Sequence, residues 1–178
     1  MKVILLVIAF CSLFFSFVTL EEKIPWTEDY KLTWSDFKSP KANGTGFVAS
    51  TSSGIAYSYS SMGNAEKVEV TIKVSCNFYP KKSWYSKKDA SDYILKHEQA
   101  HFDISEIYAR ILRKRFEKTT YSEELNSQLE EIFYKTDAER VAMQQKFDEE
   151  TNHSKKPSEE KEWESYIAQQ LKEYERWK

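Results

Sequence analysis

Cysteine and histidine are both scarce in this chain, and neither sign of charge predominates. The 178 residues include two cysteines and three histidines, and the formal net charge is −2. A charge so close to neutral argues against a general nucleic-acid binder, because neutralising phosphates requires a basic face. Internal repeats are absent as well, so a single domain is the simplest organisation, and an aromatic content of 15% supplies material for its core.

The shortage of cysteine excludes a disulfide framework. Cys11 lies in an apolar N-terminal run, so a mature chain without that run would retain only Cys76 and could form no internal disulfide. Cys76 stands near the end of a predicted strand, and we interpret it as a small buried hydrophobic residue.

Long apolar runs are absent except at the N-terminus. Lys2 precedes an apolar stretch that reaches residue 20, after which Glu21 and Glu22 make the chain polar. This pattern predicts a secretory signal over residues 1–20, followed by one domain over residues 21–178 in the periplasm or outside the cell. The small residues before residue 20 form a poor cleavage site, so an uncleaved membrane anchor is the alternative.

The remainder of the chain divides into a β-rich part and a helical part. Residues 30–80 are rich in β-branched and aromatic side chains broken by turn signals, whereas helical periodicity dominates after residue 86. The order predicts an α+β fold, in which a small antiparallel sheet is followed by a helical layer. We expect a hairpin of residues 47–52 and 55–60 around Ser53-Gly54 and a one-sided strand over 67–78. Helices are expected over 86–117, 122–150 and 157–177, and Ser86 or Asp89 is the expected N-cap of the first.

Two of the three histidines stand four residues apart in an H-E-x-x-H motif at residues 97–101. Residues i and i+4 share one face of a helix, so the imidazoles of His97 and His101 can bind one ion. In zinc hydrolases with this motif the metal acidifies water and polarises the scissile carbonyl, while the glutamate, here Glu98, accepts and returns the proton. The motif therefore predicts a Zn²⁺ site with Glu98 as catalytic residue.

A catalytic zinc usually has three protein ligands, and His153 is the natural candidate for the third. It lies near the end of the second predicted helix. If this helix packs antiparallel to the first, its end lies beside the motif. A three-histidine site requires His153 to lie within about 8 Å of His97 and His101, given metal to nitrogen bonds of about 2.1 Å. Carboxylates can replace a histidine ligand, and the alternatives are Glu106, Asp148, Glu149 and Glu150.

Further groups are expected around the metal. A carboxylate should contact the outer nitrogen of each histidine, and the candidates are Asp103, Glu106 and Asp148. A donor for the developing oxyanion could come from Tyr93, Tyr108 or Asn152.

Four segments of the chain resemble a known family. They are LTWSDF at 32–37, KKSW at 81–84, LKHEQAHFDI at 95–104 and ETNH at 150–153. Together they resemble a bacterial secreted family of unknown function that is grouped with the zincin-like metallopeptidases. The resemblance implies a zincin-like fold and zinc-dependent peptide hydrolysis, and it supports the assignments of His97, Glu98, His101 and His153. Phe147 and Ser154 depart from the family pattern, which implies tyrosine and glycine at these positions.

The leading hypothesis is an exported zinc metallopeptidase whose peptide or protein substrate lies along an edge strand of the sheet. A non-catalytic envelope protein that keeps a zincin-like fold for binding is the alternative. A third possibility, a helical partner-binding protein using residues 120–178, has only charged amphipathic helices in its favour. No nucleic acid is expected as a partner, and contact with a membrane is expected only through an uncleaved N-terminal segment.

Overall fold

The computed structural model describes residues 21–40, 46–63, 68–122 and 124–178. The expected signal at residues 1–20 lies outside this part of the chain. Within the described ranges, none of the helices is both long and apolar enough to cross a membrane.

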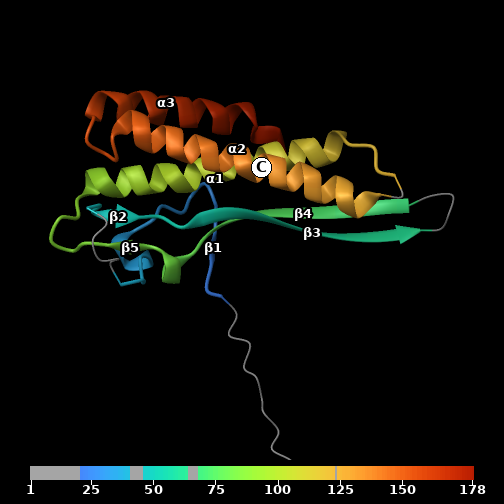
Figure 1. Ribbon diagram of the computed structural model, residues 1–178, viewed down its shortest axis with the longest axis horizontal. Helices are drawn as coiled ribbons and strands as arrows, with labels where there is room; N and C mark the ends of the chain where they lie inside the picture. Colours follow the sequence, from blue (N-terminus) through green and yellow to red (C-terminus); the bar gives the residue numbers. More distant parts are fainter. Residues whose placement is uncertain (1–20, 41–45, 64–67, 123) are drawn as a thin grey trace, which may run out of the picture.

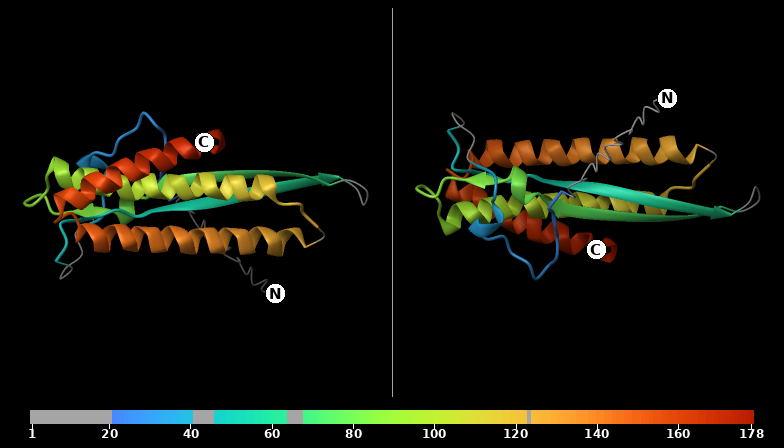
Figure 2. Two further views of the ribbon diagram at one scale, coloured as in Figure 1. Left: turned by 90° about the horizontal axis from the view of Figure 1, so that it is seen from above. Right: turned by 90° about the horizontal axis from the view of Figure 1, so that it is seen from below.

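Helices cover one face of a small antiparallel sheet (Figure 1). Helix α1 (Asp92–Lys118) lies directly on the strands, and α2 (Leu125–Thr151) and α3 (Pro157–Glu173) flank it on its outer side (Figure 2). The α+β prediction, with a sheet followed by a helical layer, is confirmed.

Two long strands form most of the sheet. Strand β3 (Ser53–Gly63) pairs antiparallel with β4 (Val68–Phe78), with Ile55 opposite Cys76. The one-sided strand predicted over residues 67–78 is confirmed. The hairpin predicted around Ser53-Gly54 is wrong, because these two residues lie inside β3, which continues to Gly63.

Three two-residue strands complete the β layer. Strand β1 (Ile24–Pro25) adds to β4, giving the order β1-β4-β3. Strand β2 (Ala49–Ser50) pairs with β5 (Trp84–Tyr85) in a separate ladder rather than with β3. Because β2 and β5 sit beside the first half of α1, they place a β segment next to the H-E-x-x-H motif (Figure 1).

Helix α1 begins later than the sequence predicts. Its N-cap is Ser91, whose hydroxyl accepts a hydrogen bond from the backbone N–H of Ile94 at 3.3 Å. Ser86 and Asp89 were the predicted caps, and both are wrong. They belong to a preceding turn, in which the Ser86 hydroxyl donates to Asp89 Oδ2 at 2.9 Å. Although α1 begins at Asp92, the motif at residues 97–101 still lies in the first half of the helix.

The other helices agree closely with prediction. Helix α2 ends with Asn152 in the left-handed conformation, and α3 begins with Pro157 in its first turn, where proline is favoured. A short 3₁₀ helix, η3 (Glu175–Trp177), follows α3. Two further 3₁₀ turns, η1 (Trp34–Asp36) and η2 (Pro80–Lys82), connect the β segments.

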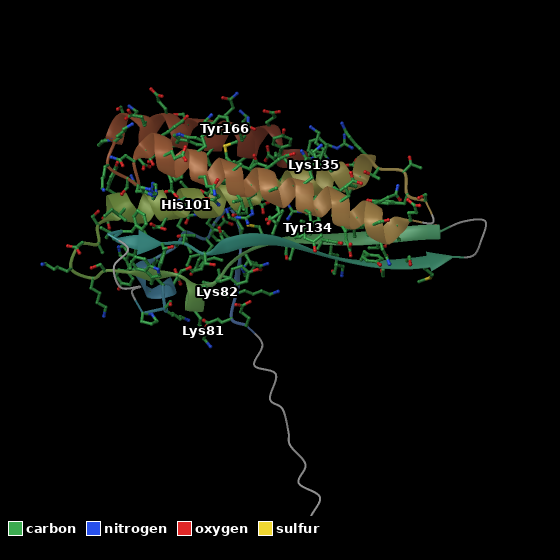
Figure 3. The ribbon with its side chains drawn as sticks, in the orientation of Figure 1. Lys81, Lys82, His101, Tyr134, Lys135 and Tyr166 are labelled. Atoms are coloured by element: carbon green, nitrogen blue, oxygen red, sulfur yellow. The ribbon has the colours of Figure 1, made fainter. Side chains whose placement is uncertain are left out.

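The hydrophobic core has two parts, one on each side of α1. Between α1 and the sheet lie side chains such as Phe78, Phe102 and Leu112, and between α1, α2 and α3 lie Phe147 and Trp163. Cys76 is a free, buried thiol, as predicted, and burial raises its pKa well above the usual range. Lys81 and Lys82 lie on the exposed side of the sheet away from the helices (Figure 3).

Candidate metal centre

Three helix ends meet at the H-E-x-x-H motif. The first half of α1, the last turns of α2 and the first turn of α3 come together at the end of the molecule that holds β2 (Figure 1). His101 marks this region in Figure 3. This arrangement arises because α2 runs antiparallel to α1, so that α2 ends, and α3 begins, beside the start of α1.

One atom from each of three side chains forms a compact triangle. His97 Nε2 and His101 Nε2 lie 3.3 Å apart, and each lies 3.2 Å from Asp148 Oδ1. Among the described residues, these three side chains form the group of potential metal ligands, and their donor atoms all lie within 4.8 Å of one another. Asp148 is one of the carboxylates that the sequence offered for the third ligand, and its Oδ1 completes this triangle.

These distances fit a tetrahedral metal site. Ligands about 2.1 Å from a tetrahedral ion are separated from one another by about 3.4 Å. All three edges of the observed triangle are 3.2 to 3.3 Å, so one ion can contact the three atoms with little movement. Two imidazoles and a carboxylate also form a donor set that suits zinc.

His153 lies at the rim of this triangle. Its Nδ1 is 3.2 Å from Asp148 Oδ1, the same oxygen that both motif histidines approach. The nitrogens of His153 and of either motif histidine are therefore at most twice 3.2 Å, or 6.4 Å, apart. This separation lies inside the limit for a three-histidine site, although His153 does not belong to the compact group and its side chain is 40% exposed.

The backbone that carries His153 is unusual. Asn152, His153 and Ser154 all have positive φ values, of 49°, 51° and 64°. Residues other than glycine rarely adopt this conformation, which costs free energy that the surrounding structure must offset. Phe47 packs on the His153 ring, with 4.5 Å between centroids, and Asp148 contacts its Nδ1, so contacts on two sides hold the imidazole over the site.

The outer nitrogens of both motif histidines have acceptors. His97 Nδ1 lies 2.6 Å from Oε1 of the buried Glu160, and His101 Nδ1 contacts Gln144 Oε1. The Gln144 amide is oriented because its NH₂ group donates to His101 O at 2.8 Å and to Ser105 Oγ at 3.2 Å. Both contacts favour a proton on Nδ1, so Nε2 is the nitrogen of each ring that is directed into the triangle and that a metal can bind.

Phe147 fixes the planes of the two rings. It is fully buried, stacks on His97 at 4.5 Å between centroids and meets His101 edge-on at 5.0 Å. Trp163 of α3 packs against its other side at 5.3 Å. Rotation of either imidazole would therefore disturb a packed aromatic cluster.

The charges around His97 are strongly coupled. Burial lowers the pKa of His97, but hydrogen bonds to Asp148 and Glu160 outweigh this effect and raise the pKa to about 9. Burial would raise the pKa of Asp148, yet its contacts with His101 and His97 hold it well below the usual range. Without an ion, the cluster thus favours a protonated imidazole beside an ionised carboxylate.

Glu98 faces the same site with an unpaired oxygen. Glu98 is 4% exposed. Among the buried side-chain nitrogen and oxygen atoms of the described residues, Glu98 Oε2 is the one without a hydrogen-bond partner. A buried carboxylate oxygen without a donor is costly, so this atom is suited to receive a proton from a bound molecule.

A cavity of about 340 Å³ opens over these groups. Its floor includes His97, Glu98 and His101, and one wall is the segment 46–51 that contains β2. The Thr51 hydroxyl donates to Glu98 O at 3.3 Å, which holds this wall against α1. Tyr93, a predicted oxyanion donor, also lines the cavity, and burial raises the pKa of its hydroxyl.

Several predicted site residues lie elsewhere. Glu106, predicted as a ligand or as a contact for a histidine, pairs instead with Arg110 and Arg113, 3.0 Å from each. Asp103 accepts hydrogen bonds from Trp26 at 2.7 Å and Gln99 at 2.8 Å, so its predicted contact with a ligand histidine is wrong. The remaining candidates outside the cavity lining are Tyr108, Glu149, Glu150 and Asn152.

Sequence reasoning did not find Gln144 and Glu160. Gln144 and Asp148 are separated by four residues on α2, the same spacing as the histidines opposite them, and Phe147 lies on the same face. This spacing was a usable signal. Glu160 had none, because it is one of several acidic residues at the start of α3.

Comparison with known proteins yields one family match. The model of a family described as "Bacterial protein of unknown function (DUF922)" matches residues 32–155, more than half of the 178 residues. The chain belongs to the DUF922 family. Neither a curated protein nor a solved structure matches this DUF922 protein. The match includes the ligand triangle and His153 but ends before Glu160.

The structure also describes Phe147 and Ser154, the two positions at which the resemblance implies tyrosine and glycine. Ser154 has a φ of 64°, a conformation that glycine adopts without steric cost, so a glycine expected there is understandable. Phe147 places a ring without a hydroxyl between the motif histidines and Trp163.

Proposed function

We propose that this DUF922 protein is an exported zinc-dependent metallopeptidase with a zincin-like arrangement of its site. The observation that carries the proposal is the triangle of His97, His101 and Asp148, whose ligand atoms have tetrahedral spacing. The unpaired Oε2 of Glu98, in a cavity beside them, adds the group that hydrolysis requires. Export is inferred from the apolar run that follows Lys2.

Each residue of the site has a separate task in this proposal. A bound zinc supplies Lewis acidity, which acidifies water and polarises a carbonyl. His97, His101 and Asp148 would hold the ion, and a site with three protein ligands would leave room for a reacting molecule. Glu98 accepts the proton of the attacking water and returns it to the leaving amine. His153, whose Nδ1 lies 3.2 Å from Asp148 Oδ1, would be close enough to bind either the ion or the substrate.

The substrate we propose is a peptide in extended conformation. The segment 46–51 that forms one wall of the cavity includes β2, and among the described strands only β5 pairs with β2, along one of its edges. An extended chain can add to a free strand edge through main-chain hydrogen bonds, which place the scissile bond with few demands on side chains. Phe47, Tyr93 and Ile94 make part of the cavity apolar.

A second candidate is a non-catalytic protein that uses the same cavity for binding. Phe147 favours it, because it cannot donate a hydrogen bond where the family pattern implies a tyrosine hydroxyl. Glu98 favours the enzyme, since a protein that only binds has no need for a buried, unpaired carboxylate oxygen.

Metal analysis combined with a peptidase assay tests the proposal. We expect one zinc per chain in the wild type, no stoichiometric zinc in a His97→Ala, His101→Ala double variant, and zinc without activity in Glu98→Gln. The control is Glu131→Gln, an exposed acidic position on α2. A wild type that binds no zinc after gentle purification would overturn the metal site, and zinc-loaded protein that cleaves no peptide in a library would support the binding protein.

A further inference from the structure

A buried carboxylate from the last helix stands directly behind the first motif histidine. Glu160 is 5% exposed, and its Oε1 lies 2.6 Å from Nδ1 of His97, on the opposite side of the ring from the ligand triangle. Since a carboxylate can only accept a hydrogen bond, the contact places the ring proton on Nδ1. It therefore leaves Nε2, directed toward His101 and Asp148, as the nitrogen that a metal can bind.

We infer that Glu160 is a positioning residue that sets the tautomer and orientation of His97, and that α3 thereby completes the metal centre. The inference rests on the proposed metal site and extends it beyond residues 32–155, where the family match lies. Glu160 itself touches neither the ion nor the substrate.

The position of Glu160 is held from several directions. It lies in the first turn of α3, where acidic side chains are favourable, and its backbone N–H donates to Lys156 O at 3.1 Å. One turn later, Trp163 packs on Phe147, and its Nε1 donates to Glu150 Oε2 at 2.9 Å. These contacts join the start of α3 to the end of α2, so the helix that carries Glu160 cannot move away from His97 without disturbing the aromatic cluster.

The far end of α3 is anchored independently. Arg113 of α1 donates to Trp177 O at 2.9 Å, and Arg110 donates to Leu171 O. Lys114 lies 4.8 Å from the ring centroids of both Tyr174 and Trp177. Because these contacts do not involve Glu160, a substitution at this residue can change the histidine contact while α3 stays in place.

The two motif histidines differ in the kind of acceptor behind them. His101 meets the neutral amide oxygen of Gln144, whereas His97 meets a carboxylate. Hydrogen bonds to a charged acceptor are stronger than those to a neutral one, so the larger effect on metal affinity is expected on the His97 side. Loss of such an outer contact typically lowers metal affinity by about 10- to 100-fold.

Zinc titration of full-length variants tests the inference. We expect Glu160→Ala to raise the Kd for zinc about 10- to 100-fold, and Glu160→Gln, whose amide oxygen can still accept from Nδ1–H, to raise it less. Glu162→Ala is the matched control, since this carboxylate is exposed two residues further along the same helix. It should bind zinc as the wild type does.

A second readout is independent of zinc affinity. Proton NMR of the metal-free wild type should show a downfield Nδ1–H resonance of His97, which remains in Glu160→Gln, moves upfield there, and disappears in Glu160→Ala. Circular dichroism in the presence of a chelator checks that each variant is folded. If Glu160→Ala fails to fold, the graded change in Glu160→Gln decides.

The outcomes separate this inference from the proposed function. A wild type that binds no zinc overturns the metal site itself. A wild type that binds zinc, together with a folded Glu160→Ala protein of equal zinc affinity and unchanged His97 resonance, overturns the positioning role and leaves the metal site intact.

Discussion

Asp148 Oδ1 is the atom on which all three histidines of the chain converge. His97 Nε2, His101 Nε2 and His153 Nδ1 each lie 3.2 Å from it. A carboxylate oxygen in this place can ligate a metal or, without one, accept hydrogen bonds from imidazolium groups. At the scale of single residues, Asp148 is therefore the proposed third ligand, and His153 is the alternative that substitution must separate from it.

The two candidates for the third ligand predict different affinities. We expect Asp148→Ala to lower zinc affinity by at least about 100-fold, because it removes a ligand, whereas His153→Ala should lower it by less than about tenfold. Competition with a chromophoric chelator measures both. Equal and large losses would show that His153 is also a ligand, and a large loss in His153→Ala alone would exclude Asp148.

The protonation of His97 predicts how zinc binding depends on pH. A metal ligand must be a neutral imidazole, and the carboxylates beside His97 raise its pKa to about 9 in the metal-free protein. Zinc must therefore displace a proton at any pH below this value, so its apparent affinity should increase by up to about tenfold per pH unit from pH 6.5 to 9 and then level off. Calorimetry in buffers of different ionisation enthalpy measures the released proton. Affinity that falls over this range would contradict the assignment.

At the scale of elements, the site is a contact between two helix faces of matching period. His97 and His101 are four residues apart on α1, and Gln144 and Asp148 are four residues apart on α2. Antiparallel packing places one pair against the other, and Phe147 fills the space between them. The packing that holds α2 to α1 thus also sets the ligand spacing.

Phe147 should contribute strongly to stability. Its ring is fully buried against His97, His101 and Trp163, so Phe147→Ala should lower the free energy of unfolding by about 3 to 5 kcal/mol. Val141→Ala, on the same helix with 39% of its surface exposed, is the control and should cost much less. Urea unfolding of the metal-free proteins gives both values. A loss below about 1 kcal/mol for Phe147→Ala would contradict the packing described.

At the scale of the whole molecule, a buried ionic network joins the helices to the sheet. Glu106 on α1 pairs with Arg110 and Arg113, and Arg113 also donates to Val74 O of β4 and to Trp177 O at the end of the chain. This network lies away from the cavity that contains Glu98. It serves the fold and has no place in the proposed chemistry.

Substitution of Glu106 tests whether this residue stabilises the fold or binds the metal. Glu106→Gln leaves the buried guanidinium of Arg110 without an anionic partner, which should lower the free energy of unfolding by about 3 to 5 kcal/mol. Zinc stoichiometry at low temperature should remain unchanged. Glu117→Gln, whose side chain is 48% exposed in its pair with Arg176, is the control and should have little effect. Loss of zinc in a folded Glu106→Gln protein would restore this residue as a candidate ligand.

Much of this protein could be predicted from local sequence. The period of two over residues 67–78 and the helical period after residue 86 follow from which side chains must be buried. Strand β4 and the three helices were therefore predicted correctly in kind, and nearly in extent except at the start of α1. The pairing of His97 and His101 is equally local, because the geometry of one helix brings residues i and i+4 together.

Only the tertiary structure decided the partners of these local features. Ser53-Gly54 resembles a turn, yet the long pairing with β4 continues through it, because that register buries Ile55 against Cys76. Asp148 lies in the ligand triangle, and Glu160 and Gln144 lie behind the histidines, because two helix returns bring distant residues together. The sequence by itself determined which residues could bind a metal, through the fixed geometry of one helix. The packing of three helices determined which acidic side chains face those residues, because local sequence does not distinguish Glu160 from the other acidic residues at the start of α3.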